Sequence, residues 1–289
     1  MHNFWKVMFA FVTASLILAC GIASAPSTTT PPQQNVATIV AATMQSYAAV
    51  SNPNDVVYGN VSLIIPQGLA TNALAGTVPA LTDTQQWSPW DVAPGHIKIL
   101  VDNYAQFSNQ DAEILVYPAQ EFESTSDMVK ENIQRLQALE NKSALLAAEN
   151  MPSIPFFNAG QVFAAQMQMV SFEDGAGVRL VTQYASGIVP VNNSELFYHF
   201  QGLTNDGKYY VIAILPTSAD FLPPDETKYT IDSPTVLDFP GYYKPNATGD
   251  DFKAYFKAVT DKLNTVPPQN FKPPLTTLDA FIQSITITP

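Results

Sequence analysis

Residues 161–185 read QVFAAQMQMVSFEDGAGVRLVTQYA, and residues 195–215 read ELFYHFQGLTNDGKYYVIAIL. Each stretch has two runs rich in apolar side chains, joined by Asp174-Gly175 in the first stretch and by Asn205-Asp206-Gly207 in the second. Such runs predict β-strands, and Asp-Gly pairs favour tight hairpin turns. Together the stretches predict a four-strand antiparallel meander with strands at 161–173, 177–185, 195–203 and 208–215.

The register of the first hairpin follows from its turn. A two-residue turn at Asp174-Gly175 places Val170 opposite Arg179 and Gln166 opposite Gln183. One face then carries polar side chains, namely Gln166, Gln168, Arg179 and Gln183. The other face carries apolar ones, namely Met167, Met169, Leu180 and Tyr184. Since burying an unpaired arginine and three amides is costly, we expect the apolar face to pack against helices and the polar face to lie outside.

The polar face of this hairpin is a candidate ligand-binding surface. The guanidinium of Arg179 can hold a carboxylate through two hydrogen bonds, and the amides of Gln166, Gln168 and Gln183 can add further bonds. Two other interpretations remain open. The face is simply solvated, or Arg179 pairs with an acidic side chain that has a structural role.

Further strands are expected before the meander. Val56–Tyr58 and Val61–Ile65 flank Gly59-Asn60, a pair that predicts a hairpin turn, and two aliphatic runs at 97–101 and 113–117 predict additional strands. The sheet of this protein is therefore expected to contain more than the meander.

Helices are predicted on both sides of the meander. Apolar stripes at helical spacing lie at 126–148, where Ser126 can cap the helix, at 250–263, and after Thr277. Pro216–Thr248 is rich in proline and has no periodicity, so it predicts a long loop. The fold class is therefore expected to be α+β, an antiparallel sheet flanked by helices.

The order of these elements resembles the PsbP-like α/β/α sandwich. The local likeness lies in Ser62-Leu63-Ile64-Ile65-Pro66-Gln67-Gly68-Leu69, an aliphatic strand that ends in Pro-x-Gly. A helix, an antiparallel meander and a closing helix follow, so the likeness in element order covers most of the chain after its leader. Members of that fold are mainly non-catalytic adaptors and assembly factors, and the resemblance implies such a role. It assigns no individual site residue.

The first twenty residues read MHNFWKVMFAFVTASLILAC. Lys6 gives a short cationic start, and Val7–Ala19 is an apolar run of signal-peptide length. The run ends in Ile17-Leu18-Ala19-Cys20-Gly21, which resembles the bacterial lipobox, where the cysteine receives diacylglycerol. The resemblance implies a bacterial lipoprotein that is held at the outer side of a membrane by lipid on Cys20.

Two alternatives to the lipid anchor remain open. Cleavage after Ala23-Ser24-Ala25 would release a soluble protein, although Pro26 directly after that site disfavours it. An uncleaved apolar anchor is the other alternative, and the short length of Val7–Ala19 disfavours it.

The domain boundaries follow from composition. Residues 1–19 are expected to be the signal peptide and 20–35 a lipidated tether, because PSTTTPPQQ at 26–34 is extended and has nothing to build a core. Residues 36–52 are expected to be a helix or stalk, since Val36–Val50 carries apolar side chains at helical spacing. Residues 53–289 are expected to form a single α+β domain.

Composition also limits the function. After removal of the leader the chain carries 12 basic and 25 acidic side chains, a net charge of −13, which repels nucleic acid. Cys20 is the only cysteine, so neither a disulfide nor a zinc site of cysteine and histidine is expected. No hydrolase, phosphate-loop or dinucleotide motif occurs around His96, His199 or elsewhere. We expect no metal and no cofactor.

A few residues carry weaker hints of chemistry. Trp87 and Trp90, next to Asp91, could stack on a sugar ring, although tryptophans in such a position more often close the edge of a core. Carboxylate pairs that could serve a glycosidase occur at Glu121/Glu123, Asp225/Glu226 and Asp250/Asp251. Asp250 and Asp251 more often occupy a helix N-terminus, where negative charge is favourable.

The sequence therefore predicts a lipid-anchored, extracytoplasmic binding or assembly module without catalysis. Its partners are expected to be the membrane, through the N-terminal lipid, and an envelope protein or a small ligand. The alternatives are a carboxylate-dependent hydrolase that acts on an extracellular glycan, and a purely structural envelope protein.

Overall fold

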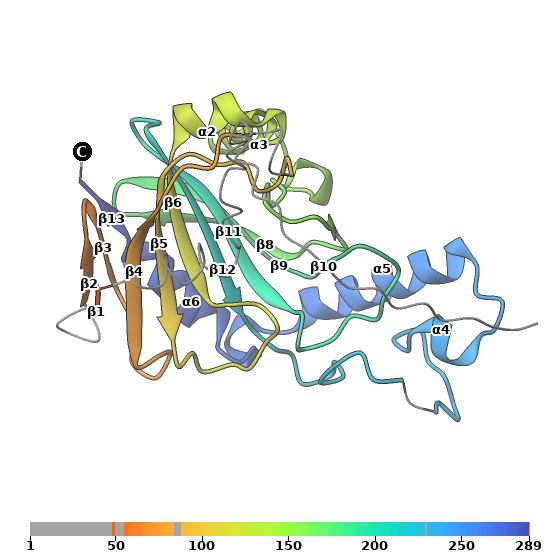
Figure 1. Ribbon diagram of the computed structural model, residues 1–289. Coiled ribbons are helices and arrows are strands. Elements are labelled where there is room, and N and C mark those ends of the chain that lie inside the picture. Colours follow the sequence, from red (N-terminus) through yellow and green to blue (C-terminus); the bar gives the residue numbers. More distant parts are fainter. Residues whose placement is uncertain (1–47, 50–54, 84–87, 229, 289) are drawn as a thin grey trace, which may run out of the picture.

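A computed structural model describes residues 48–49, 55–83, 88–228 and 230–288. An eight-stranded sheet forms the middle of the molecule, and every neighbouring pair of strands in it is antiparallel (Figure 1). In spatial order its strands are β1 (Ala48–Ala49), β4 (Asn72–Val78), β5 (His96–Asp102), β6 (Glu113–Pro118), β12 (Tyr209–Pro216), β11 (Phe197–Thr204), β9 (Gly175–Thr182) and β8 (Ala165–Phe172). The predicted α+β class is confirmed.

The other strands of the described residues form two smaller sheets. One has the order β13-β3-β2 and consists of β13 (Thr286–Ile287), β3 (Val61–Ile64) and β2 (Asp55–Tyr58). The other pairs β10 (Tyr184–Ala185) with β7 (Gly160–Gln161). The hairpin predicted around Gly59-Asn60 is confirmed, since Gly59 has a φ of 58° between β2 and β3.

Helices cover both faces of the large sheet (Figure 1). On one face α2 (Ala119–Thr125) and α3 (Asp127–Glu140) lie over Leu115, Val178, Leu180 and Ile212. On the other face α5 (Gly249–Thr265), α6 (Leu275–Gln283) and the β13-β3-β2 sheet pack on the larger apolar core. The remaining helical turns are η1 (Ala148–Asn150), α4 (Pro240–Tyr243) and η2 (Pro268–Asn270).

Two helix boundaries differ from the prediction. The helix predicted at 126–148 ends at Glu140, where Lys142 takes a φ of 59°, and Ser126 joins it to α2 without a capping hydrogen bond from its side chain. The last helix begins at Leu275 after Pro274, so Thr277 lies inside it and does not cap it. Asp251 does lie at a helix N-terminus, where it forms a reciprocal capping box with Thr248.

The register of the β8–β9 hairpin differs by two residues from the predicted one. The turn residues are Glu173 and Asp174, so Arg179 lies opposite Gln168 and not opposite Val170. Gly175 belongs to β9 because it presses against β11, where an added Cβ would lie 2.1 Å from the carbonyl oxygen of Leu203. A shift of two residues keeps Gln168, Met169, Arg179 and Leu180 on their predicted faces.

The expectation that the polar face of this hairpin lies outside is wrong. Met167, Met169 and Leu180 do pack on the α2–α3 side, as predicted. Arg179 points the other way, yet it is only 2% exposed because α5 and α6 cover that face as well. Arg179 can be buried there because Asp279 of α6 lies 3.3 Å from its Nε.

Several predictions fall outside the described residues. They concern the leader 1–19, the tether with Cys20, and Trp87. Of the helix predicted at 36–50 only Ala48–Ala49 is described, and these two residues are a strand paired with Ala75 and Leu74. Within the described ranges, no helix has the length and apolar character needed to cross a membrane.

Candidate functional site

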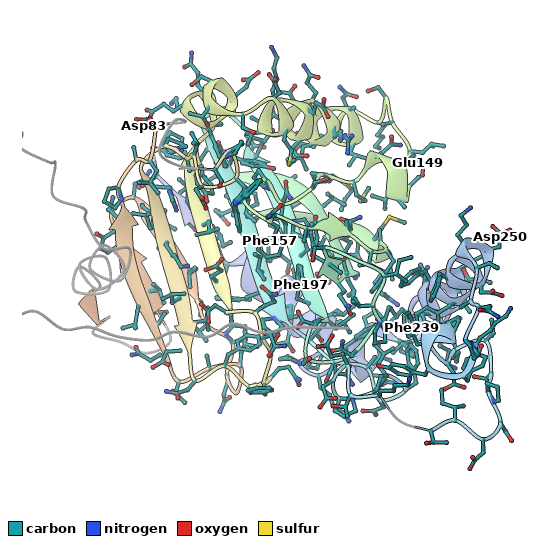
Figure 2. The ribbon with its side chains drawn as sticks, turned by 45° about the vertical axis from the view of Figure 1, so that its right-hand side comes forward. Asp83, Glu149, Phe157, Phe197, Phe239 and Asp250 are labelled. Atoms are coloured by element: carbon teal, nitrogen blue, oxygen red, sulfur yellow. The ribbon has the colours of Figure 1, made fainter. Side chains whose placement is uncertain are left out.

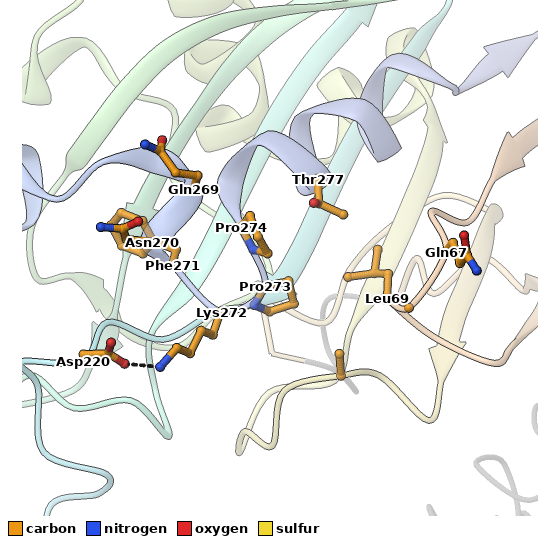
Figure 3. A pocket seen from close by; sticks show the side chains of 12 residues that line it. Gln67, Leu69, Asp220, Gln269, Asn270, Phe271, Lys272, Pro273, Pro274 and Thr277 are labelled. Carbon is orange, nitrogen blue, oxygen red and sulfur yellow. Dashed lines mark hydrogen bonds and ion pairs between the residues drawn. The ribbon is translucent and has the colours of Figure 1, made fainter.

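An open groove of about 550 Å³ lies at the end of the sheet where β5 and β12 finish (Figure 3). Four segments that are distant in sequence line it: the turn after β3, the loop after β5, the loop after β12, and the link between α5 and α6. Their lining residues are Gln67, Gly68, Leu69, Ala105, Asp220, Gln269, Asn270, Phe271, Lys272, Pro273, Pro274 and Thr277.

The groove has an apolar floor and a polar rim. Leu69, Phe271 and Pro273 are buried and form the floor. The exposed amides of Gln67, Gln269 and Asn270 stand around it. Because each amide offers both donors and an acceptor, the rim can bond to either polar group of a peptide backbone.

One charged pair lies at the side of the groove. Lys272 forms an ion pair with Asp220, drawn as the dashed line in Figure 3. Both side chains are exposed, so the pair can open at small cost. While closed, it leaves this side of the groove without net charge.

The wall that carries Lys272 is fixed by backbone pairing. Lys272 and Ser218 exchange two backbone hydrogen bonds of 2.9 and 3.1 Å, and the hydroxyl of Thr217 donates to the carbonyl oxygen of Pro273 at 3.0 Å. On the opposite side, the amide N–H of Ala105 donates to the carbonyl oxygen of Leu69 at 2.9 Å. Hydrogen bonds within the fold therefore hold both walls of the groove.

An exposed aromatic side chain lies in the loop that lines the groove. Phe107 is 81% exposed and follows the lining residue Ala105 by two positions. Gln106 between them accepts a hydrogen bond from the hydroxyl of Ser218, which holds this loop against the groove wall. Exposed aromatic side chains of this kind are common anchors of protein interfaces.

Three of the predicted ligand-binding residues meet in a structural cluster. Arg179 donates to the carbonyl oxygen of Gln166 and, at 2.8 Å, to Oε1 of Gln168, while its Nε faces Asp279. Asp279 also accepts a 2.9 Å hydrogen bond from the hydroxyl of Tyr198. Burial, followed by the charge of Asp279, raises the pKa of Tyr198 well above its ordinary value.

Gln166 connects this cluster to the helix that leads into the groove wall. It has a φ of 54° at an irregularity in β8, and its Nε2 donates to the carbonyl oxygens of Leu263 and Val266 at 2.8 Å each. Its backbone N–H donates to the side chain of Asn264 at 2.6 Å. Gln166 therefore satisfies the open carbonyls at the C-terminus of α5.

Gln183 and Trp90 lie elsewhere. Gln183 is fully buried, where its amide donates to the carbonyl oxygen of Pro190 and accepts from the N–H of Asn192. Trp90 lies in a turn at the opposite end of the sheet and is 38% exposed. The structure thus brings Arg179, Gln166 and Gln168 together and keeps Gln183 and Trp90 apart from them.

The carboxylate pairs do not meet at the groove. Glu121 and Glu123 are on α2, Asp250 and Asp251 are at the far end of α5 (Figure 2), and Asp225 caps the N–H of Thr227. A second, smaller hollow of about 190 Å³ contains Asp174 and Asp206, and both of these already accept hydrogen bonds within the fold. Among the described residues, no group of three potential metal ligands occurs.

The groove was not predicted from the sequence. Its floor and rim come mostly from QNFKPP at 269–274, a proline-rich link between two amphipathic helices. The sequence does contain a signal for it. Two stretches of turn-favouring residues, this link and Pro66-Gln67-Gly68, each interrupt regular elements, and both line the groove.

Comparison with known proteins found no match. No protein-family model matches the chain, and no curated protein or solved structure is significantly similar to it.

Proposed function

We propose that this protein is a lipid-anchored, extracytoplasmic binding module whose groove receives a segment of a partner protein of the cell envelope. The location rests on the Lys6 start, the apolar run and Ile17–Cys20. The binding role rests on one observation: the groove with an apolar floor and an amide rim, whose walls are held by hydrogen bonds within the fold.

The chemistry of the groove favours an uncharged stretch of polypeptide. Burying one apolar side chain on Leu69 and Phe271 would supply affinity, since apolar area removed from water contributes roughly 25 cal/mol per Å². The rim amides would bond the backbone of that stretch and fix its direction. Phe107 would then be covered by the remainder of the partner.

We also propose that the region 161–215 is a four-strand meander and that the domain is PsbP-like. The successive antiparallel pairing of β8 with β9, β9 with β11 and β11 with β12 supports the meander. The layer of helices on each face of the sheet supports the likeness. In this arrangement the sheet is the rigid support and its loops form the groove.

Site-specific cross-linking in cells tests the binding role. A photo-reactive amino acid at Asn270, on the rim, is expected to capture one discrete protein partner. The same group at Lys253, an exposed position on α5 away from the groove, is expected to capture none. Equal capture at both positions would contradict a groove-specific partner.

Filling the groove should abolish this capture. Thr277→Trp places an indole in the groove, and Thr276→Trp places the same group on the exposed neighbouring position. We expect Thr277→Trp to remove the Asn270 cross-link by more than about tenfold, which corresponds to about 1.4 kcal/mol, and Thr276→Trp to retain it. Thermal unfolding of both variants checks that they remain folded. Persistence of the cross-link in folded Thr277→Trp would exclude the groove.

A glycan hydrolase is the second proposal. Its only specific support is Trp90, partly exposed beside the exposed Asp91, where a sugar ring could stack. If this alternative holds, the unmodified protein binds envelope glycan and Trp90→Ala removes that binding. The unmodified protein then gives no cross-link from Asn270. A purely structural role requires that neither binding event occurs.

A further inference from the structure

The segment 151–157 covers a buried histidine, His199, in which only one of the two ring nitrogens has a hydrogen-bond partner among the described residues. His199 lies on β11 and is completely inaccessible to solvent. Its Nε2 lies 2.7 Å from Nε2 of Gln201, whereas its Nδ1 has no partner within the described residues. A polar ring atom that is buried and unpaired is costly, so such sites call for a physical explanation.

The neighbours of His199 determine which of its ring nitrogens carries the proton. Gln201 can only donate through Nε2, so Nε2 of His199 must be the acceptor and its proton must sit on Nδ1. Gln201 cannot reverse its amide freely, because its Oε1 accepts from the hydroxyl of Tyr210 and its Nε2 also donates to the carbonyl oxygen of Ser153 at 2.9 Å. Protonation of His199 at Nε2 would therefore place its N–H donor directly against the N–H donor of Gln201.

The same amide holds the segment above it. Residues 151–157 form no helix or strand and cover this part of the sheet with Ile154, Phe156 and Phe157. Ser153 is held by Gln201 and by two hydrogen bonds of 2.6 and 3.0 Å with Asn132 of α3. Ile154 donates its N–H to the hydroxyl of Tyr184 at 2.9 Å. The rings of Phe157 and Phe197, both labelled in Figure 2, meet edge to face here with their centroids 6.3 Å apart.

Among the described residues that surround His199, no fixed negative charge is free to offset its protonation. The residues paired with His199 on the neighbouring strands are Leu180 and Ile214, and the titratable groups that face it are the neutral phenols of Tyr184 and Tyr210. The nearest carboxylate in the same row is Glu113, opposite Ile214, and it is already paired with Lys98 at 2.5 Å. From α3 the contact is the neutral Asn132, while Arg135 donates to the carbonyl oxygen of Met151.

We propose that His199 is a pH-sensitive latch: its protonation releases the segment 151–157 from the sheet by turning Gln201 away from Ser153. Release would expose Ile154, Phe156, Phe157 and the sheet surface beneath them, which is a new apolar surface at acidic pH. An acidic exterior would thus change what the protein can bind.

The direction of the effect follows from linkage. Burial lowers the pKa of His199 from 6.5 to about 3 in the closed form. The exposed imidazole of the open form binds a proton near pH 6.5, so the closed form is fully favoured above pH 6.5 and loses its advantage as the pH falls toward 3. Between pH 7 and pH 4.5 the ratio of open to closed form should rise by about 100-fold.

Amide hydrogen exchange at pH 7.0 and pH 4.5, corrected for the intrinsic exchange rate, tests the latch. Protection of 151–157 is expected to fall by about 100-fold, while that of β5 and β12 stays unchanged. His199→Gln, which keeps a polar atom near the position of Nε2 but cannot titrate, is expected to remove this pH dependence. His96→Gln is the matched control, since burial also lowers the pKa of His96, to about 4, at a different place on the sheet. It should leave the response of 151–157 intact.

Two outcomes would overturn the proposal. One is pH-independent protection of 151–157 in the unmodified protein, a result that does not depend on the folding of any variant. The other is loss of protection over the whole sheet at pH 4.5, which would show global unfolding and not a local release.

Discussion

Arg179→Ala is expected to lower the free energy of unfolding by about 3–5 kcal/mol, the usual cost of removing one partner from a buried ion pair. Asp279 is only 14% exposed on its side chain and would lie next to the phenol of Tyr198 without its cationic partner. The carbonyl oxygen of Gln166 and Oε1 of Gln168 would each lose a charged donor. Urea unfolding of the variant measures the change.

Lys208→Ala is the matched control for this loss. Lys208 forms an ion pair with Asp206 at 2.9 Å, but both side chains are exposed. Because solvent screens an exposed ion pair, the removal of Lys208 should change the free energy of unfolding very little. A cost of Arg179→Ala no greater than that of Lys208→Ala would show that the Arg179–Asp279 pair does not hold α6 on the sheet.

A double variant separates lost charge pairing from lost packing. Arg179→Met with Asp279→Leu removes both charges and keeps most of the volume. Replacing a buried pair by apolar groups is often neutral, so we expect this double variant to be more stable than Arg179→Ala by about 2 kcal/mol or more. A double variant as unstable as Arg179→Ala would assign the loss to packing.

Leu180→Ala is expected to lower the free energy of unfolding by about 2–4 kcal/mol. This loss is similar in size to that of Arg179→Ala, but its cause is different. Leu180 is completely buried between β9 and the α2–α3 layer, so its removal leaves a cavity. Leu145→Ala removes the same atoms from a side chain that is 80% exposed, and it should cost less than about 0.5 kcal/mol. Comparable losses in the two variants would contradict the assignment of Leu180 to the core.

The neighbouring positions 179 and 180 show what the sequence could and could not predict. The two faces of the hairpin were predictable because side chains alternate along a strand, and an error of two residues in the register leaves that alternation intact. The burial of the polar face was not predictable. It depends on Asp279, which lies 100 positions later in the chain and reaches Arg179 only when α6 docks.

Elements that lack a distinctive composition were also missed. Strand β4 reads NALAGTV, and its alanines and glycine have low β-propensity, so only its pairing with β5 makes it a strand. The groove was missed for a related reason. Its lining comes from four short segments that no local pattern connects, and only the docking of the α5–α6 link against the loops after β3 and β12 creates it.

The lipid anchor at Cys20, on which the proposed location of this protein depends, is tested most directly by membrane fractionation with mass measurement of the mature protein. The unmodified protein should be found in the membrane fraction with Cys20 as its N-terminal residue, carrying the mass of diacylglycerol. Cys20→Ser should be released from the membrane fraction or accumulate with its leader uncleaved. A Cys20→Ser protein that fractionates and migrates like the unmodified one would contradict the lipid anchor.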